Sequence, residues 1–409
     1  MKVLVLSSLA YSLTNFRGAL LREMVANGHE VIAVAPDRNA EVETDLAEYG
    51  IGFRTVPMQR AGKNPFRDLR LLLGYIALMI REQPDLVLAY TQKPIVYGGL
   101  AARILAVPRF YAMMSGLGHV FSPEGKSSPF FRHVVARLYR EAVRRARAVF
   151  VFNSDDRGDM IDLGIVSPTQ KVITVPGSGI DLERFSEQPL PRSHITFLLI
   201  ARLLRDKGIY EFAEAARKIT VDYPDCDFKI LGHIDAENPT GLTAEECESL
   251  SRQYPVRFIP GTSDVRPYLA GASVFVLPSY YREGLPRTLL EAMATGRPVI
   301  TTDMPGCREP VEEGKNGFIV PPRSTEALVE AMSRFVENPE LIAEFGKRSR
   351  KLAESIYDVR KVNRLLLEEM DLISPRNFTA PYPAQADEAG SQDQAGAQAK
   401  PITPLSAVN

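Results

Sequence analysis

Tryptophan is absent from this chain of 409 residues, and cysteine and histidine are scarce, with three and five residues. Cys226, Cys247 and Cys307 are odd in number and widely spaced, so they predict neither a disulfide framework nor a cysteine-ligated metal site. Such a set fits a reducing compartment. Long apolar runs are also missing. The most apolar segment, residues 69–80, contains Arg70 and is too short to cross a bilayer.

Positive charge is distributed unevenly, although the formal net charge of the whole chain is only −1 at pH 7. Residues 1–150 contain 20 Lys and Arg against 12 Asp and Glu, whereas the remainder contains 29 against 38. A basic first part could meet an anionic lipid surface or a phosphorylated substrate. The alternative is an ordinary solvated surface without a partner. Nothing in this balance indicates a nucleic-acid partner.

The segment Leu277–Val299 combines an anion site with two carboxylates. Its first part follows an apolar strand, and its second part has the composition of a helix. Glu283 lies in the loop and Glu291 lies inside the helix. Gly284 and Pro286 stand at the helix start, where free N–H groups and the positive end of the helix dipole attract anions. One short segment therefore offers a phosphate site and two acceptors for hydroxyl groups, which suits a sugar linked to a nucleotide.

Short apolar strands alternate with helices through the first half of the chain. This alternation predicts an α/β domain with a doubly wound parallel sheet, in which ligands bind at the carboxyl ends of the strands. One helix is expected over Phe16–Ala26. The expected strands are Lys2–Leu6, Glu30–Ala35, Phe53–Val56, Leu86–Ala89, Phe110–Met113 and Ala148–Phe152.

Three strand-end loops of this first half carry polar groups. Residues 8–18 lack the G-x-G-x-x-G pattern, which argues against a dinucleotide-binding oxidoreductase. They instead contain hydroxyl groups, Asn15 and Arg17, which suit a sugar or a phosphate. The second loop contains Lys93, and the third, residues 115–121, contains glycines that allow close approach to a ligand.

Residues 130–149 read as a basic amphipathic helix, in which apolar side chains share the segment with arginines. Such a helix can lie on a membrane surface. The alternative is an ordinary packed helix with an arginine-rich solvent face. The arginines are Arg132, Arg137, Arg140, Arg144, Arg145 and Arg147.

A second α/β domain is expected after the linker around Pro189 and Pro191. Its first strand leads to Arg202 and Lys207, two cations that could stabilise the charge that builds on a leaving diphosphate. Neither a metal ion nor another cofactor is expected. The expected strands are Ile195–Ile200, Cys226–Leu231, Val256–Ile259 and Val274–Leu277, and the expected helices are residues 264–269, 289–294, 324–337, 339–355 and 359–371.

Three motifs of the second half resemble those of retaining glycosyltransferases with the GT-B fold, of the family-four or group 1 type. E-G-L-P-R-T-L-L-E, followed by A-M-A-T-G-R-P-V-I, resembles their E-x(7)-E motif. V-P-G-S-G-I-D, with Phe185, resembles the domain-crossing segment P-N-G-V-D-x-x-x-F, although Ser178 replaces the usual Asn. A-R-L-L-R-D-K-G resembles G-R-L-x-x-x-K-G, with Ala201 in place of Gly.

The resemblance implies two Rossmann-like domains that face each other across a cleft. The expected parts are an acceptor-binding domain (1–187), a nucleotide-sugar-binding domain (188–357), a helix returning to the first domain (358–373) and, from composition, a disordered tail (374–409). The implied catalytic residues are His119, Glu283, Arg202 and Lys207. The implied donor-binding residues are Glu291, Gly284, Leu285, Pro286, Ile259 and Gly232, and the expected acceptor-binding residues are Asn15, Arg17 and Lys93.

The implied reaction moves a hexose or N-acetylhexosamine from a UDP-sugar, with retention, to a saccharide on polyprenyl diphosphate. Such enzymes extend undecaprenyl-diphosphate-linked glycans in bacterial surface polysaccharide assembly. We therefore expect a cytoplasmic protein held peripherally at the inner membrane; no signal peptide is expected, because the apolar run Val3–Leu6 is too short. Two alternatives remain: a nucleotide-sugar 2-epimerase, which would need further catalytic acids in the cleft, and a non-catalytic UDP-sugar binder, against which the intact set of Arg202, Lys207, Glu283 and Glu291 argues.

Overall fold

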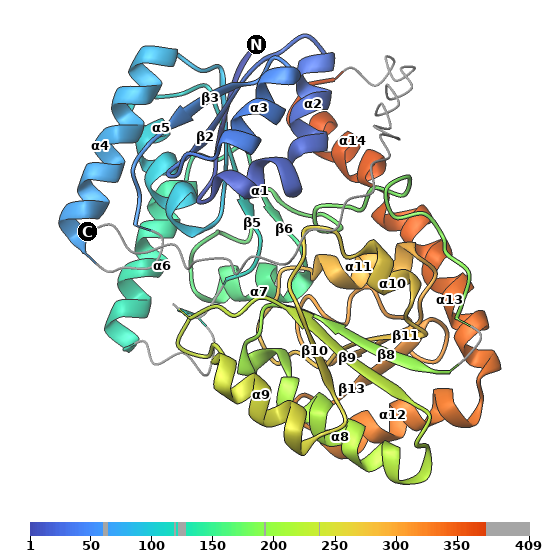
Figure 1. The fold of residues 1–409 in the computed structure, drawn as a ribbon. Coiled ribbons are helices and arrows are strands. Elements are labelled where there is room, and N and C mark those ends of the chain that lie inside the picture. Colours follow the sequence, from blue (N-terminus) through green and yellow to red (C-terminus); the bar gives the residue numbers. More distant parts are fainter. Residues whose placement is uncertain (60–63, 118–119, 122–127, 192–193, 237, 374–409) are drawn as a thin grey trace, which may run out of the picture. The chain divides into compact units, whose positions relative to one another are not determined.

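The structure is a computed structural model that describes residues 1–59, 64–117, 120–121, 128–191, 194–236 and 238–373. The described residues form two sheets in which every paired strand is parallel (Figure 1). The first sheet has the order β3-β2-β1-β4-β5-β6-β7 and the second has the order β10-β9-β8-β11-β12-β13. These sheets confirm the expected pair of α/β units.

The strands of the first sheet are β1 (Lys2–Leu6), β2 (Glu30–Ala35), β3 (Gly52–Thr55), β4 (Leu86–Tyr90), β5 (Arg109–Met114), β6 (Ala148–Val151) and β7 (Val172–Thr174). Those of the second are β8 (Thr196–Ile200), β9 (Asp227–Gly232), β10 (Arg257–Pro260), β11 (Val274–Leu277), β12 (Val299–Thr302) and β13 (Gly317–Val320). All ten strands that the sequence predicts are found, with ends that differ by one residue at most. The three-residue edge strand β7 and the strands β12 and β13 are not among these ten.

The segment after β1 differs from its prediction, because residues 8–18 are not simply a loop. Helix α1 (Ala10–Asn15) occupies most of this segment, and α2 (Gly18–Ala26) begins two residues later than expected. The N–H of Ala10 donates to the carboxylate of Asp37, which lies 27 residues further along the chain. A first helical N–H that is bound by so distant a side chain leaves no capping signal in the local sequence.

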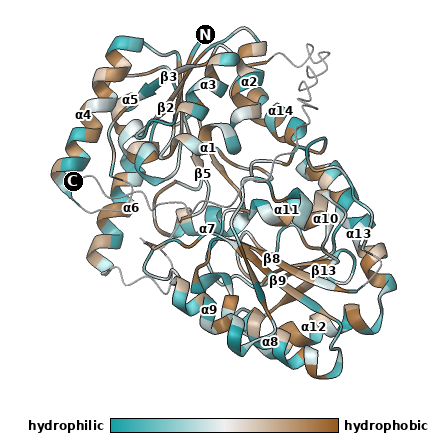
Figure 2. Ribbon diagram, viewed as in Figure 1, coloured by the Kyte–Doolittle hydropathy of each residue, from teal (hydrophilic) through white to brown (hydrophobic). Residues whose placement is uncertain are grey.

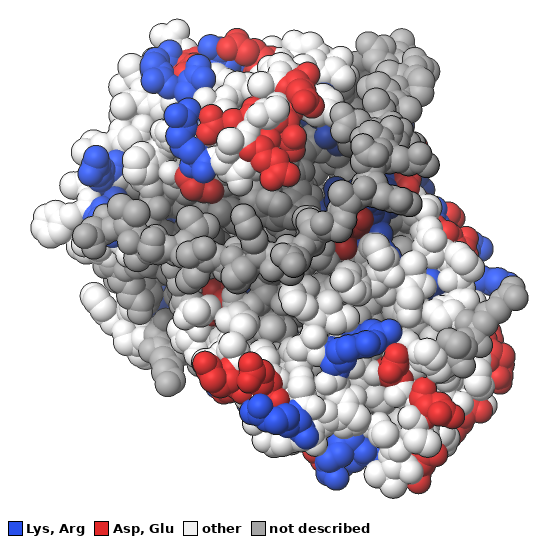
Figure 3. Space-filling model, in the orientation of Figure 1, with Lys and Arg blue, Asp and Glu red and all other residues white. Residues whose placement is uncertain are grey.

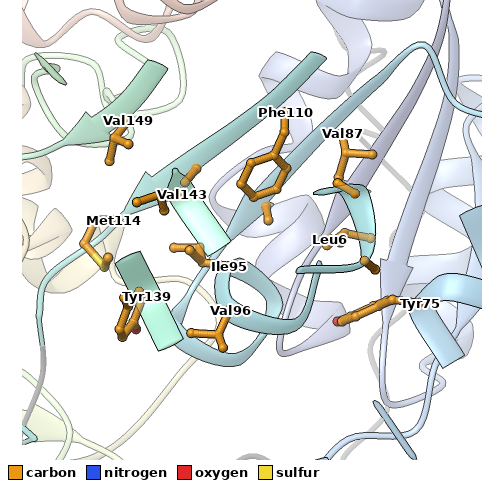
Figure 4. Close-up of a cluster of buried hydrophobic side chains, with 14 of the residues drawn as sticks. Leu6, Tyr75, Val87, Ile95, Val96, Phe110, Met114, Tyr139, Val143 and Val149 are labelled. Atoms are coloured by element: carbon orange, nitrogen blue, oxygen red, sulfur yellow. The ribbon is translucent and has the colours of Figure 1, made fainter. Parts of the chain in front are cut away.

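Helices cover both faces of the first sheet. One face carries α4 (Pro65–Glu82), a π-helical turn (Pro94–Gly98), α5 (Gly99–Ile104) and α6 (Pro129–Val143), and the other carries α1, α2 and α3 (Ala40–Glu48). The close-up of the first of these two cores shows Tyr75 of α4 and Tyr139 and Val143 of α6 around strand residues such as Phe110 and Val149 (Figure 4). Helix α7 (Ser154–Asp162) follows β6.

The last described helix, α14 (Val359–Glu369), returns to the first sheet. Its buried residues Val362, Leu366 and Leu367 belong to the same core cluster as α1, α2 and α3. The side-chain amide of Asn363 donates to the Glu23 carboxylate of α2 at 2.8 Å. Burial raises the pKa of Glu23 to about 7, and this hydrogen bond opposes the shift. The expected return of the C-terminal helix is thus confirmed.

The second sheet is also covered on both faces. Helices α8 (Ile209–Asp222), α9 (Ala244–Gln253) and α12 (Thr325–Glu337) pack on one face, and α10 (Arg266–Ala270) and α11 (Arg287–Ala294) pack on the other. Helix α13 (Glu340–Leu352) and the π-helical turn Ala353–Tyr357 complete the helical cover of the second sheet. Hydrophobic residues, brown in Figure 2, concentrate in the strands of this sheet. Among the described residues no helix is both long enough and apolar enough to span a bilayer.

Arg297, which follows α11, is completely buried and joins the interdomain linker to the second sheet. Burial lowers the pKa of its guanidinium to about 10. Hydrogen bonds to backbone carbonyls compensate this burial, because all the donors of the planar guanidinium find acceptors. The acceptors are the carbonyl oxygens of Gln188, Pro189, Leu269, Ala270 and Thr295, at 2.8–3.1 Å.

We predict that Arg297→Lys lowers the free energy of unfolding by about 2–4 kcal/mol, because a lysine has too few donors and leaves buried carbonyls without partners. Urea unfolding followed by circular dichroism measures this loss. The control is Arg334→Lys on α12, whose partner Glu330 is solvent-exposed and whose replacement should change stability by less than about 0.5 kcal/mol. Equal losses in the two variants would contradict the prediction.

Candidate active site

The candidate site forms where two neighbouring strands of the second sheet end. Strand β8 leads to the 3-10 helix Arg205–Lys207, and β11 leads to the loop 278–286 and then to α11. β8 and β11 are adjacent, but the chain does not run directly from one to the other. After β8 it first forms β9 and β10, which lie on the flank of β8 away from β11. Ligands bind preferentially at such a switch point. The topology therefore brings together two loops that lie far apart in the sequence.

Gly208 allows these two loops to touch. Its φ of +74° lies in the left-handed region that glycine adopts without strain. A Cβ at this position would collide with the carbonyl oxygen of Pro278, the first residue after β11. The contact fixes the position of Lys207, which immediately precedes this glycine, against the loop that contains Glu283.

Lys207 and Glu283 form a largely buried ion pair at this contact. The Lys207 ammonium donates to Oε1 of Glu283, which also accepts a hydrogen bond from the Ser279 hydroxyl at 3.3 Å. The ring of Tyr281 lies 5.1 Å from the ammonium. Desolvation lowers the pKa of Lys207 to about 8, and the negative charge of Asp206 opposes this shift. The pair is the strongest polar feature of the site, and Ser279 and Tyr281 were not predicted as part of it.

Helix α11 begins at the same place. Pro286 precedes it, and no side chain caps its first turn. The free N–H groups of that turn therefore remain available to an anion. Glu291, one turn into the helix, is buried and pairs with Arg287 at 3.2 Å. Burial raises the pKa of Glu291 to about 7, and the positive charge of Arg287 opposes this shift.

Residues of the first sheet's domain contact the loop that contains Glu283. A Cβ at Gly284 would lie 2.5 Å from the carbonyl oxygen of Ser115, so only glycine fits there. The side-chain amide of Asn153 donates to the Gly284 carbonyl at 3.0 Å. Leu285 packs against hydrophobic clusters on both sides. These contacts join the two strand-end edges at the candidate site.

Acidic residues of α7 add ion pairs across the same contact. Asp155 binds Arg308 at 2.7 Å, and Arg282 lies 3.4 Å from Asp156 and 2.5 Å from Asp159. Burial raises the pKa of Asp156 to about 6, and Arg282 opposes the shift. Sequence reasoning missed this set. The available signal was the position of these acids directly after β6, at the carboxyl edge of the first sheet.

Arg202, Gly232 and Ile259 follow or end the neighbouring strands β8, β9 and β10. Arg202 is half-exposed and pairs with Asp235 at 2.9 Å, although it lies close enough to Lys207 to lower the pKa of that ammonium. Gly232 is buried and packs against the backbone of Ala201, and Ile259 is half-buried. The structure thus pairs Lys207 with Glu283, places Glu291 on the helix that follows the same loop, and leaves Arg202 half-exposed.

Acidic side chains do not form a metal cluster in the part of the chain that the structure describes. No group of three or more His, Cys, Asp or Glu residues there could hold a metal ion. Asp225 and Asp227 form an Asp-x-Asp sequence, but they stand at the amino end of β9, away from the strand-end loops. Asp227 pairs there with His194 and other basic residues.

The three expected acceptor-binding residues lie in different surroundings. The carbonyl oxygen of Asn15 accepts a hydrogen bond from Arg287 of α11. Arg17 is buried between the rings of Tyr90 and Phe152, and burial lowers its pKa to about 10.

Lys93, the third expected residue, pairs with Asp68 of α4 at 2.6 Å. This ion pair ties the loop after β4 to that helix. Both partners are largely buried, and the pair lies at the carboxyl edge of the first sheet. His119, predicted in the loop after β5, lies outside the described residues. Asn15, Arg17 and Lys93 therefore form a candidate acceptor side. Of these three residues, Asn15 has a hydrogen bond to the second sheet's domain, through Arg287.

The arrangement of the site suits a phosphorylated sugar. An uncapped helix N-terminus and the Lys207 ammonium can bind a diphosphate. The carboxylates of Glu283 and Glu291 can accept hydrogen bonds from two sets of hydroxyl groups. Because Glu283 already pairs with Lys207, a phosphate that binds Lys207 would free this carboxylate for a neighbouring hydroxyl.

Comparisons with known proteins agree with this geometry. Residues 182–352 match the family "Glycosyl transferases group 1", and residues 15–177 match the family "Glycosyl transferase 4-like domain". The first match contains the E-x(7)-E segment, and the second contains the loops after β4 and β5 of the first sheet.

Two curated relatives are similar over most of the chain. An N,N'-diacetylbacillosaminyl-diphospho-undecaprenol alpha-1,3-N-acetylgalactosaminyltransferase of Campylobacter jejuni is 27% identical over 364 residues, which cover 85% of this chain and 93% of the relative. A UDP-Gal:alpha-D-GlcNAc-diphosphoundecaprenol alpha-1,3-galactosyltransferase of Escherichia coli is 24% identical over 343 residues, which cover 81% and 86%.

Solved structures share the fold. Anabaena Alr3699/HepE in complex with UDP superposes with a TM-score of 0.71 at 20% identity, over 91% of this chain and all of that chain. The sucrose-phosphate synthase of Thermosynechococcus elongatus superposes with a TM-score of 0.70 at 18% identity, over 90% and 98%. Two facing Rossmann-like sheets and two family matches that together span residues 15–177 and 182–352 show that this chain belongs to the group 1 glycosyltransferases and is a glycosyltransferase with the GT-B fold.

Proposed function

We propose that the protein transfers a hexose or N-acetylhexosamine from a UDP-sugar to a saccharide carried on polyprenyl diphosphate. The observation that carries this proposal is the Lys207–Glu283 pair beside the uncapped start of α11. The Lys207 ammonium and the first N–H groups of α11 complement a diphosphate, and the Glu283 carboxylate complements the hydroxyl groups of a sugar. The names of the two relatives both specify an acceptor carried on diphospho-undecaprenol, which supports the choice of acceptor.

The donor would lie against the second sheet's domain, for which we propose residues 188–357. The diphosphate would bind Lys207, Arg202 and the first N–H groups of α11, near Gly284, Leu285 and Pro286. Glu291 would hold the ribose hydroxyls, with Gly232 and Ile259 beside the nucleoside. The UDP complex of HepE, a protein of the same fold, supports a uridine nucleotide.

The transferred sugar would face Glu283. Negative charge grows on the leaving diphosphate as the glycosidic bond breaks, and the fixed cations stabilise that charge in the transition state. The acceptor hydroxyl would attack from the same side as the leaving group, and a diphosphate oxygen would take its proton. This course retains the anomeric configuration. His119 would contact the donor sugar from the first domain, for which we propose residues 1–187.

The acceptor would lie on the first domain near Asn15, Arg17 and Lys93. Two of these residues are cationic, which suits the diphosphate of a lipid-linked saccharide. We propose that the protein acts at the cytoplasmic face of the inner membrane, where its arginine-rich helix α6 contacts the lipid surface. Helix 358–373 would hold the two domains in one unit.

The first test of the proposal is UDP release from a panel of UDP-sugars, with and without a synthetic polyprenyl-diphosphate saccharide, in the presence of EDTA. We expect release from one donor that depends on the acceptor. Tight UDP binding with no release from any pairing would contradict the proposed acceptor. Conversion of the UDP-sugar without an acceptor would instead indicate an epimerase.

Glu283→Gln should lower kcat by about a hundredfold or more and change the UDP dissociation constant little, because the sugar contact strengthens in the transition state. The matched control is Glu291→Gln, which should mainly raise the UDP dissociation constant, since this carboxylate is assigned to the ribose. Steady-state kinetics and calorimetry with UDP measure both effects. A Glu283→Gln enzyme that transfers at the wild-type rate would remove Glu283 from the site.

Lys207→Ala should weaken UDP binding by about tenfold or more, because it removes a charge-assisted hydrogen bond to the diphosphate. In the wild type, UDP affinity should fall as pH rises above about 8, where the Lys207 ammonium loses its proton. Lys207→Arg should shift that fall to higher pH. Lys218→Ala, which removes an exposed lysine paired with Glu326, is the control and should bind UDP normally. An unchanged UDP affinity in Lys207→Ala would show that Lys207 does not bind the diphosphate.

A further inference from the structure

Helix α4 is apolar on two opposite faces. Its inner face packs into the core of the first domain through Leu71, Tyr75, Leu78 and Met79. Its outer face carries Phe66, Leu69, Leu73 and Ile80, whose exposed fractions are 82%, 53%, 56% and 59%. The spacing of three, four and seven residues places these four side chains in one row along the helix.

A row of this kind has no role within the fold. A surface helix that packs on one side normally presents polar residues on the other. Single exposed apolar residues are common on protein surfaces, whereas a continuous apolar strip usually marks a contact with a partner or a membrane. Brown residues recur along α4 in Figure 2. The outer row therefore needs an occupant.

The charged residues of α4 favour an anionic occupant. Arg67, Arg70 and Arg81 are exposed beside the apolar row. Of the two acids of the helix, Asp68 pairs with Lys93, and Glu82 pairs with Arg54 and with Arg81 of the same helix. The outer surface of α4 thus presents apolar side chains and guanidinium groups without a free carboxylate.

Helices α5 and α6 extend this surface. They lie in the same layer as α4, and all three helices contribute to one core cluster on the same face of the sheet. Exposed Ile104 ends α5, and exposed Phe130 and Val134 lie near the start of α6. Further along, α6 exposes Arg137 and Arg140. Figure 1 shows α4 and α6 along one side of the molecule, where blue and white atoms adjoin in Figure 3.

We propose that this surface, formed by the outer residues of α4, α5 and α6 and here called the α4–α6 face, docks on an anionic lipid bilayer. Helix α4 would lie in the plane of the interface, with its apolar row among the upper acyl chains and its arginines at the headgroups. An apolar row bordered by cations matches a bilayer better than a second copy of this near-neutral chain. The inference rests on the proposed lipid-linked acceptor and assigns the apolar contact to α4, whereas the arginine-rich α6 supplies mainly charge.

The ion pair between Asp68 and Lys93 connects this face to the candidate active site. Asp68 precedes Leu69 of the apolar row, and Lys93 follows β4 at the carboxyl edge of the first sheet. Both side chains are largely buried, so the pair is a fixed link between the first turn of α4 and the strand-end loop. Docking through α4 would hold the acceptor side of the cleft next to the membrane that contains the lipid diphosphate.

Vesicle sedimentation of the full chain tests the α4–α6 face without any sugar substrate. Vesicles of phosphatidylglycerol and phosphatidylethanolamine should bind the wild type, and vesicles of phosphatidylcholine should bind it more weakly. Leu69→Gln/Leu73→Gln should lower the partition coefficient by about tenfold or more, because two apolar side chains leave the interface. The matched control, Val221→Gln/Ile356→Gln, alters two exposed apolar residues of the second domain and should bind like the wild type.

Two further readouts separate this inference from its rivals. Wild-type-like vesicle binding by the Leu69→Gln/Leu73→Gln variant would overturn it. If the wild type is a dimer and this variant is a monomer with unchanged vesicle binding, the apolar row is a dimer interface and the inference is also overturned. Transfer to a short, water-soluble acceptor should be equal in the wild type and the variant, whereas transfer to an acceptor embedded in vesicles should fall in the variant. If the wild type binds vesicles but transfers to neither acceptor, the proposed function fails and the docking face stands.

Discussion

The candidate site depends on a backbone contact between the two domains that leaves no space for a side chain. Gly284 lies against Ser115, and Gly116, the next residue, also lies against Gly284, so a Cβ at either glycine would meet backbone atoms. This contact holds the carboxyl edges of the two parallel sheets together. Loops that end strands of both sheets therefore meet at one place, which is why a two-domain protein of this type can present donor and acceptor groups to each other.

The charges that gather at this contact are paired with one another. Lys207 neutralises Glu283, Arg287 neutralises Glu291, and Arg282 lies between two acids of α7. Desolvation alone would discharge such groups, and each partner reduces that cost. A phosphorylated sugar offers an anion and hydroxyl groups that can replace these internal partners. The site thus holds its charges in internal pairs and presents the groups that a nucleotide-sugar needs.

The domain of the first sheet also presents the α4–α6 face, and the largely buried ion pair between Asp68 and Lys93 connects this face to the loop after β4. A lipid-linked acceptor presents a comparable combination, since its saccharide is polar and its carrier is buried in the membrane. Apolar side chains on the outside of α4 would otherwise destabilise the free protein in water. Their retention beside exposed arginines is most simply explained by a surface that leaves water during the enzyme's work.

The sequence by itself determined ten of the thirteen described strands, the two α/β units and the E-x(7)-E segment, because the period of hydrophobic residues, glycine stops and motif spacing are local properties. It also gave reason to select Lys207, Glu283 and Glu291. Only the tertiary structure decided that Lys207 meets Glu283, that Asn153 holds the Gly284 carbonyl and that residues 10–15 are helical, since these partners lie far apart in the chain. The outer row of α4 was hidden for a related reason: its apolar residues occur on both sides, and the position of the sheet decides which side is buried.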